Sequence, residues 1–210
     1  MSCTLDQLMH CFSAPLPGLN AQILLAPHYR IEETRNLAIP PNAVKSSVLL
    51  LFYHKQDICH IVLIRRPVYK GVHSGQIALP GGRWEQTDKN AYATAIRESE
   101  EEIGLDSASV SFLGKLTDLY IPPSNYLVSP FAAYYPAGIP RFKPDPHEVA
   151  AIIEVPFVWF TRKNAVKITT LNLSSGVAIQ TPCFEFEGNI IWGATAMILS
   201  EMVEMWKSTV

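Results

Sequence analysis

The segment Arg97-Glu98-Ser99-Glu100-Glu101-Glu102-Ile103-Gly104-Leu105 concentrates acidic side chains just before a glycine. Residues 90–103 are predicted to form a helix, because their apolar positions recur at helical spacing and Gly104 suits the cap that ends a helix. At about 100° per residue in a helix, Glu98, Glu101 and Glu102 fall within an arc of about 100°. Glu100 points roughly the opposite way. The segment therefore predicts one acidic helical face beside an apolar face.

Two interpretations of this acidic face stay open from the residues alone. Like charges four positions apart, as at Glu98 and Glu102, weaken a helix, and hard divalent cations such as Mg²⁺ or Mn²⁺ offset such repulsion with oxygen ligands. A solvated surface is the alternative, since Arg97 can pair with Glu101 and relieve part of the repulsion. The Pro80-Gly81-Gly82 turn that precedes the helix favours a ligand site, because glycine lets a backbone approach a ligand closely.

The composition around this segment is that of one globular domain, or of one domain with an extension. The chain has 210 residues, of which 48% are hydrophobic and 17% charged. Lys and Arg number 17 against 19 Asp and Glu, which gives a net charge of −2. This balance argues against a chain-wide basic field for nucleic acid and against a polybasic membrane arm.

The cysteines and the apolar segments restrict the setting. The four cysteines form no CxxC pair, so neither a structural zinc site nor a disulfide framework is expected. The N-terminal segment lacks the pattern of a signal peptide. The apolar stretch 190–206 contains Glu201 and Glu204 and is too short and too charged to cross a bilayer. A reduced, cytoplasmic location is expected.

The order of the predicted elements indicates an α+β fold. Pro40 and Pro41 mark a boundary between residues 1–40, an N-terminal helix with an irregular lead-in at 20–45, and the main domain at 41–210. The Pro-Gly-Gly turn is expected to stop a strand. The predicted helices span 4–13, 90–103 and 193–207, and the predicted strands span 47–53, 58–64, 77–79, 110–121, 126–135, 149–155, 166–173 and 183–186.

The acidic segment resembles the second half of the Nudix box, in which Arg-Glu is followed by a hydrophobic residue, a Glu-Glu pair and a Gly. Ser99 stands where the hydrophobic residue is usual. Gly82 and Asp88 match the first half, with Asp in place of the usual Glu. The spacing from Asp88 to Arg97 is one residue longer than in the general box and resembles the coenzyme A pyrophosphatase branch of the family.

Further segments are similar to that branch. They are His73–Gly82, Pro123–Pro130, Glu148-Val149 and Ile191–Thr195. The branch pattern also has a Leu-Arg pair upstream of the histidine, and this chain has Lys70-Gly71 there instead.

The resemblance implies a Nudix α/β/α sandwich with a mixed sheet and a site that uses Mg²⁺ or Mn²⁺. It implies that the metal ligands are Glu98, Glu101 and Glu102 together with the Gly82 carbonyl. It implies catalytic roles for Glu101, for Arg97 as the residue that orients the glutamates, and for Glu148 as general base or additional ligand. The substrate contacts that it implies are Arg66, Lys70 and His73. Asp88 is expected to favour the helix dipole or to contact substrate.

The implied activity is hydrolysis of the diphosphate of coenzyme A or acyl-CoA to 3′,5′-ADP and a 4′-phosphopantetheine compound. The alternatives are a Nudix hydrolase of another dinucleotide or nucleotide sugar, and a ligand-sensing module without turnover. A third is isomerisation of a prenyl diphosphate, which would use a Cys and a Glu. The expected partner is a small-molecule nucleotide, with no nucleic acid and no membrane, and a homodimer stays open.

Overall fold

The computed structural model describes residues 3–36, 38–69, 74–172 and 176–209. Its helices and helical turns are α1 Leu5–Cys11, α2 Leu19–Gln22, η1 Ile23–Leu25, η2 His28–Arg30, α3 Ile31–Asn36, α4 Ala91–Ile103, η3 Ser107–Ser109, η4 Pro122–Ser124, α5 Phe157–Phe160 and α6 Gly193–Thr209. Its strands are β1 Val44–Lys55, β2 Ile58–Arg65, β3 Ile77–Ala78, β4 Gly81–Arg83, β5 Ser111–Lys115, β6 Leu119–Ile121, β7 Tyr126–Tyr135, β8 Ala151–Pro156, β9 Val166–Asn172, β10 Ala178–Phe186 and β11 Asn189–Trp192. No helix in these ranges is long and apolar enough to cross a membrane.

The long strand β1 is the centre of a mixed eight-stranded sheet in the order β3-β2-β1-β7-β5. It forms the predicted antiparallel hairpin with β2 and lies parallel to β7, from Val44 opposite Tyr126 to Tyr53 opposite Tyr135. Three further pairings complete the sheet, with β4 on β1, β6 on β7 and β8 on β2. The apolar run in β1 is buried on both faces, as expected for a strand with helices on either side of the sheet.

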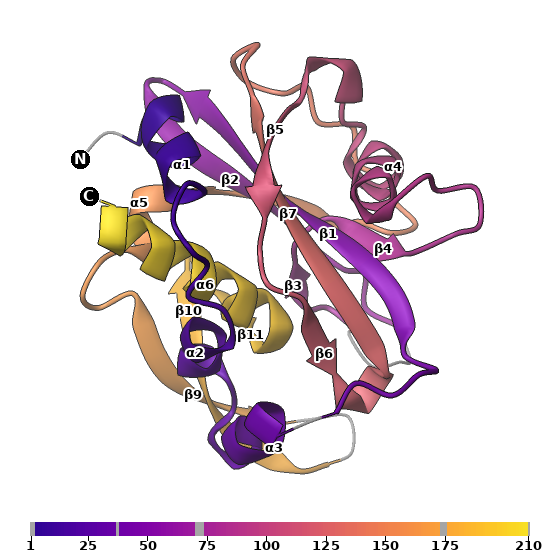
Figure 1. Cartoon of the computed structure of the whole chain (residues 1–210), viewed down its shortest axis with the longest axis vertical. Coiled ribbons are helices and arrows are strands. Elements are labelled where there is room, and N and C mark those ends of the chain that lie inside the picture. The colour runs from indigo at the N-terminus through magenta and orange to yellow at the C-terminus, as the bar shows by residue number, and fades with distance from the viewer. Residues whose placement is uncertain (1–2, 37, 70–73, 173–175, 210) are drawn as a thin grey trace.

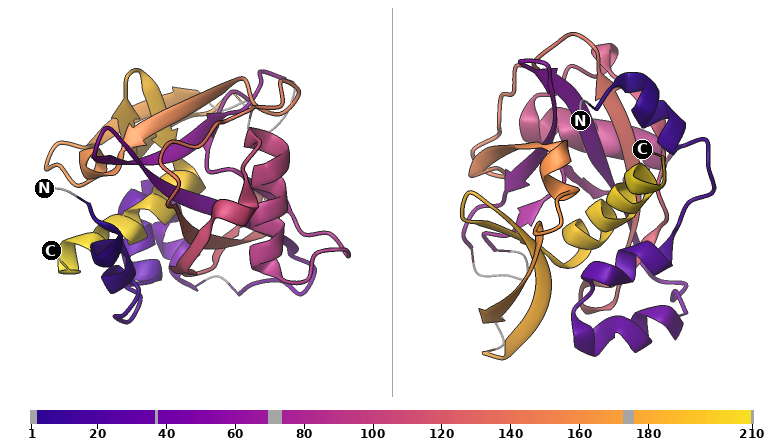
Figure 2. Two further views of the ribbon diagram at one scale, coloured as in Figure 1. Left: turned by 90° about the horizontal axis from the view of Figure 1, so that it is seen from above. Right: turned by 90° about the vertical axis from the view of Figure 1, so that its left-hand side faces the viewer.

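The two main helices cover opposite faces of this sheet (Figures 1 and 2). Alternate residues of β1 divide between them, since Leu49 and Leu51 join the cluster under α4 while Leu50 and Phe52 join the cluster under α6. A second sheet, in the order β11-β10-β9, borders the α6 side. The predicted α+β class and the α/β/α sandwich with a mixed sheet are confirmed.

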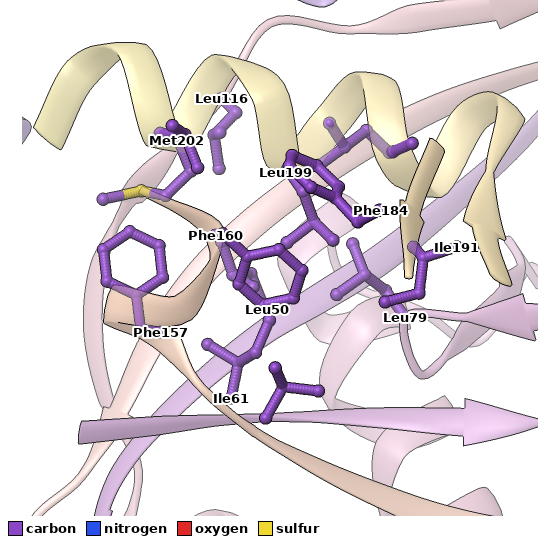
Figure 3. Close-up of a cluster of buried hydrophobic side chains, with 14 of the residues drawn as sticks. Leu50, Ile61, Leu79, Leu116, Phe157, Phe160, Phe184, Ile191, Leu199 and Met202 are labelled. Carbon is purple, nitrogen blue, oxygen red and sulfur yellow. The ribbon is translucent and has the colours of Figure 1, made fainter. Parts of the chain in front are cut away.

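The cluster under α6 has more buried residues than the cluster under α4. Figure 3 shows part of it. Phe157 packs edge-on against Phe52 at 5.2 Å between ring centroids and against Trp206 at 5.5 Å. Such aromatic pairs stabilise a core beyond the area that they bury. The cluster holds α6 and the second sheet against the central strands.

The N-terminal segment contributes to the same cluster. Thr4 and Gln7 form a capping box that starts α1, and Leu8 and Cys11 of α1 are buried. The predicted irregular lead-in at 20–45 is wrong for most of residues 20–36, where the structure has four short helical segments, α2, η1, η2 and α3. Each segment is too short for a periodic apolar pattern to reveal it. The boundary after residue 40 stays a prediction.

Two strand predictions also need correction. The stop predicted at Pro80-Gly81-Gly82 is wrong for the glycines, since Gly81–Arg83 form β4 and pair with Ser46–Val48 of β1. The strand predicted over 110–121 divides into β5 and β6. The break lies at residues 116–118, where Leu116 N donates to Pro130 O at 3.0 Å and Thr117 N bonds to a carboxylate of α6.

Candidate active site

Helix α4 carries the acidic side chains and has a defined start and end. The Asn90 side chain accepts a hydrogen bond of 2.9 Å from Ala93 N at the first turn. Gly104 ends the helix in the left-handed region at φ +65°. On the sheet-facing side of α4, Ser99 is fully buried and donates to Ala95 O at 2.7 Å. A serine therefore serves at the Nudix-box position that is usually hydrophobic, because its hydroxyl is satisfied within the helix.

Strand β4, which contains Gly81 and Gly82, lies beside α4 (Figure 1). Gly81 N donates to Glu102 Oε2 at 2.8 Å. A Cβ atom built on Gly82 would collide with the Glu98 carboxylate, so a larger residue there would displace that carboxylate from its present position. The pairing of β4 with β1 holds both glycines in place.

Glu102 is the most buried of the acidic side chains on α4, at 1% exposed. Burial raises the pKa of its carboxyl to about 7, and the charges of Glu98 and Glu148 add to the rise, while Arg66 and the Gly81 N–H oppose it. Burial likewise raises the pKa of Glu98 above its ordinary value, against the effect of Arg97. The site thus keeps carboxylates close together in a place where water does little to stabilise their charge.

Arg97 connects the acidic residues of the site. Its Nη1 lies 2.9 Å from Glu98 Oε1 and 2.9 Å from Glu101 Oε2. Its Nη2 donates to Arg83 O at 2.9 Å, which ties the helix to the end of β4. These contacts agree with an orienting role for Arg97. Glu101 is the outermost of the three predicted ligands, with its side chain 55% exposed.

Asp88 anchors Arg97 from the loop before α4. Its carboxylate accepts from Arg97 Nε at 3.0 Å and from Arg97 Nη2 at 3.1 Å, and Thr94 Oγ1 donates to it at 3.0 Å. The Arg97 hydrogen bonds lower the pKa of Asp88 to about 2. The sequence predicted a role for Asp88 at the helix dipole or with substrate, and its pairing with Arg97 was not predicted. Its only signal was that both residues belong to the same motif.

Glu148 reaches the site from a distant part of the chain. Lys143 N donates to Ile103 O at 2.8 Å, and Asp145 N donates to Glu102 O at 3.0 Å, so this loop is fastened to the last turn of α4. Glu148 N donates in turn to Asp145 O at 3.1 Å. The exposed Glu148 is close enough to raise the pKa of both Glu98 and Glu102.

Of the three predicted substrate contacts, one lies within the described residues. Arg66 Nη2 is 3.6 Å from Glu102 Oε1 and donates to Gly81 O at 3.3 Å. Its side chain is 29% exposed and therefore open to a ligand. Lys70 and His73 lie outside the described residues.

The residues present fit a divalent cation in their chemistry. The Glu98 and Glu102 carboxylates are hard oxygen donors against a glycine backbone, and among the described residues the cationic group paired with the buried Glu102 is Arg66, at 3.6 Å. Within the described ranges, no three His, Cys, Asp or Glu side chains already have the arrangement of a metal centre. In this structure Arg97 contacts Glu98 and Glu101 and supplies positive charge between them.

The cysteines lie away from this site. All four are free and buried. Cys3, Cys11 and Cys59 belong to the cluster under α6, on the opposite face of the sheet from α4. This arrangement argues against the isomerase alternative, which needs a cysteine beside the diphosphate.

Comparisons with known proteins match most of the chain by sequence. The family model for the NUDIX domain matches residues 43–180. The Nudix hydrolase NudL of Yersinia pestis (strain Pestoides F), itself uncharacterized, is 33% identical over 147 residues, which cover 69% of this chain and 71% of NudL.

Solved structures of low identity are also similar. An Ap4A hydrolase of C. elegans gives a TM-score of 0.45 at 15% identity and covers 55% of this chain and 81% of its own. A MutT/nudix family protein from Enterococcus faecalis gives 0.48 at 12% identity and covers 98% of this chain and 73% of its own.

The sequence matches decide the classification. The family model covers more than half of the chain, and the NudL match extends over more than two thirds of it. Nudix hydrolases act on nucleoside diphosphate derivatives and generally use divalent metal ions. The chain belongs to the Nudix family and is a Nudix hydrolase that acts on nucleoside diphosphate derivatives.

Proposed function

We propose that this hydrolase cleaves the diphosphate of coenzyme A or acyl-CoA, with Mg²⁺ or Mn²⁺, to 3′,5′-ADP and a 4′-phosphopantetheine compound. The observation that carries the proposal is the approach of Glu98 and Glu102 to the Gly81-Gly82 backbone with Arg66 beside them. This arrangement suits a diphosphate better than an uncharged ligand. The carboxylates can hold a cation, the partly exposed Arg66 offers a guanidinium group, and phosphate oxygens bind both.

Each residue has a separate task in the proposed reaction. Glu98, Glu101, Glu102 and the Gly82 carbonyl would hold a divalent cation, which when bound neutralises the diphosphate and lowers the pKa of an attacking water. Arg97 keeps Glu98 and Glu101 oriented, and Asp88 keeps Arg97 in place. Arg66 would bind a phosphate oxygen, with Lys70 and His73 as further substrate contacts.

Glu148 would act as general base and accept the proton of the attacking water. It is exposed and lies near both Glu98 and Glu102. A carboxylate within reach of the attacking water can accept its proton in the transition state.

Coenzyme A as substrate is supported by the segments that are similar to the coenzyme A pyrophosphatase branch. Two of them lie on either side of β1 in the sheet, since Ser129 of the downstream segment is opposite Ser47 on β1 and Ser47 is opposite Gly82 on β4. Segments that are 47 positions apart, from Gly82 to Ser129, thus meet across three adjacent strands. A substrate that contacts both would explain why both patterns occur together.

The test is a substrate panel with the full chain in Mg²⁺ or Mn²⁺, containing CoA, NADH, ADP-ribose and a capped RNA. Chromatography of the products should show 3′,5′-ADP and 4′-phosphopantetheine from CoA. The Glu98→Gln variant should lose this activity, and Glu100→Gln, on the other side of the same helix, should keep it. Cleavage of a different member of the panel alone would favour the dinucleotide or nucleotide-sugar alternative. Tight binding without turnover would favour a sensing module.

A further inference from the structure

A surface pocket lies beside the glycine strand of the site. Its volume is about 600 Å³, and its lining includes Asn42, Lys45, Arg83, Trp84 and Glu85. Residues 83–85 come directly after Gly82 in the chain. The pocket therefore begins where the proposed diphosphate site ends.

The pocket is fixed to both the sheet and α4. Trp84 N donates to Lys45 O at 3.0 Å, which continues the pairing of β4 with β1. Arg97 Nη2 donates to Arg83 O at 2.9 Å. The same arginine that orients the glutamates thus holds one wall of the pocket, so the pocket and the acidic site have a defined relative position.

The pocket offers an aromatic face together with positive charge. The Trp84 side chain is among the large apolar groups left open to solvent, at 39% exposed. Lys45 and Arg83 form no ion pair with any residue in the described part of the chain, although Glu85 is in the same lining. An exposed indole with unpaired cations beside it suits a nucleobase that carries phosphate groups, because bases stack on aromatic rings and phosphates pair with Lys and Arg.

The spacing matches such a ligand. A strand advances about 3.3 Å per residue, so the Trp84 backbone lies about 7 Å beyond that of Gly82. This is on the scale of the separation between the diphosphate and the base of a nucleotide. A diphosphate at Gly82 would therefore bring its nucleoside within reach of Trp84.

We infer that this pocket binds the nucleoside half of the substrate, with the base stacked on Trp84 and a ribose-linked phosphate beside Lys45 and Arg83. The inference rests on the proposed function for the position of the diphosphate. It assigns substrate recognition to residues outside the predicted set of Arg66, Lys70 and His73.

A second basic pocket provides a matched control. Its volume is about 500 Å³, and its lining includes Trp159, Arg162, Lys163 and Lys167. Here the aromatic ring is engaged edge-on by Phe160 and Phe186 at 5.4 and 5.5 Å, and Lys167 is paired with Glu185 at 2.9 Å. Its exposed cations Arg162 and Lys163 resemble those of the Trp84 pocket but lie away from α4 and β4.

The test is equilibrium binding of adenosine 3′,5′-bisphosphate to the full chain without divalent cation, measured by calorimetry. Trp84→Ala should weaken binding by about tenfold, within the range measured for loss of one base stack, and Trp84→Phe should recover most of the affinity. Lys45→Ala with Arg83→Ala should weaken binding and reduce its dependence on salt. Arg162→Ala with Lys163→Ala should leave binding unchanged, and melting temperatures should show that each variant is folded.

Two outcomes would overturn the inference. One is wild-type chain that does not bind the bisphosphate at millimolar concentration, and the other is equal binding by the wild type and the folded Trp84 variants. Binding that depends on Trp84 in a chain that does not hydrolyse CoA would support the inference while refuting the proposed substrate. Hydrolysis of CoA with unchanged KM in Trp84→Ala would support the proposed substrate while refuting the inference.

Discussion

Each of the two helices that cover the central sheet carries a glutamate that is almost completely withdrawn from water. Glu102 of α4 is 1% exposed and Glu201 of α6 is 0% exposed. Their surroundings differ sharply. The Glu201 carboxylate accepts hydrogen bonds from Gln22 Nε2 at 2.8 Å, from Thr117 N at 3.2 Å and from Thr117 Oγ1 at 2.6 Å.

The Glu102 carboxylate has fewer partners. It accepts one backbone hydrogen bond from Gly81 and lies 3.6 Å from Arg66, and burial raises its pKa to about 7. A buried carboxylate costs free energy unless its oxygens are satisfied. The hydrogen bonds to Glu201 come from within the fold, satisfy its carboxylate oxygens and connect the N-terminal segment to α6. The Glu102 carboxylate has fewer partners and can therefore still bind a cation. The same side chain is thus structural on one face of the sheet and available for chemistry on the other.

The largest expected effect is the difference in activity between two variants, each of which neutralises the buried glutamate on one face of the sheet. Glu102→Gln should lower kcat for the proposed diphosphate hydrolysis by about 10³-fold, a loss comparable to that of one essential electrostatic contact in an active site. Glu201→Gln should change kcat less than about threefold when assayed below its melting temperature, because Glu201 is on the opposite face from α4. Initial rates with Mn²⁺ and CoA would measure both.

The control for this pair is Glu100→Gln, which changes the charge of α4 by the same amount. The Glu100 carboxylate bonds to the Ser107 hydroxyl, outside the acidic cluster. Wild-type kcat in this variant would show that the loss is specific to Glu102. Equal kcat in the Glu102 and Glu201 variants would contradict the division between the two faces.

A bound divalent cation should stabilise the fold only through the α4 face of the sheet, where Glu102 lies. At a Mn²⁺ concentration about one hundred times its Kd, the free energy of unfolding should rise by about 3 kcal/mol. Thermal melting should show this rise in the wild type and in Glu201→Gln, and not in Glu102→Gln. Mn²⁺ that stabilises the Glu102 variant as much as the wild type would place the cation elsewhere.

Without divalent cation, the two substitutions should have opposite effects on stability. Glu201→Gln should lower the free energy of unfolding by about 2 kcal/mol, since an amide nitrogen cannot accept the hydrogen bonds that the carboxylate accepts. Glu102→Gln at pH 8 should leave the free energy of unfolding equal or higher, because it removes a poorly compensated buried charge. Urea denaturation in buffer with a chelator would compare them, and equal losses in both variants would refute the contrast.

The sequence predicted the helix of the site well and its surroundings less well. The end of α4 follows from a local signal, Gly104, and the structure confirms the helix to within one residue at its start, where Asn90 is the cap and not the first helical residue. Strand β4 was missed because glycine has a low intrinsic preference for strands. Its pairing with β1 depends on contacts that local sequence does not encode.

The relation among the three predicted ligands was also beyond the sequence. Helical spacing treats Glu98, Glu101 and Glu102 as equivalent members of one arc. Packing of β4 against α4 separates them, so Glu102 is buried while the Glu101 side chain is 55% exposed. The arrival of Glu148 at the site was expected only from the family resemblance, since it depends on hydrogen bonds between the last turn of α4 and a loop some 40 residues later in the chain.

The smallest expected effect concerns Asp88, which supports the α4 face through Arg97. Its pKa in the folded chain is about 2, below the ordinary value of 3.8. A carboxyl with a lowered pKa in the folded state stabilises the fold above its ordinary pKa and loses that contribution as the pH falls from about 4 to about 2. Asp88→Asn should therefore lower the free energy of unfolding by about 1 kcal/mol at pH 6, after allowance for solvent screening. The difference from the wild type should shrink as the pH approaches 3, where urea titrations compare the two chains.

Asp106→Asn, in the exposed turn after α4, is the control and should keep the wild-type dependence on pH. A constant difference between Asp88→Asn and the wild type from pH 6 to pH 3 would mean that Asp88 holds Arg97 by shape alone, and the charge of the α4 face would then need another source of support.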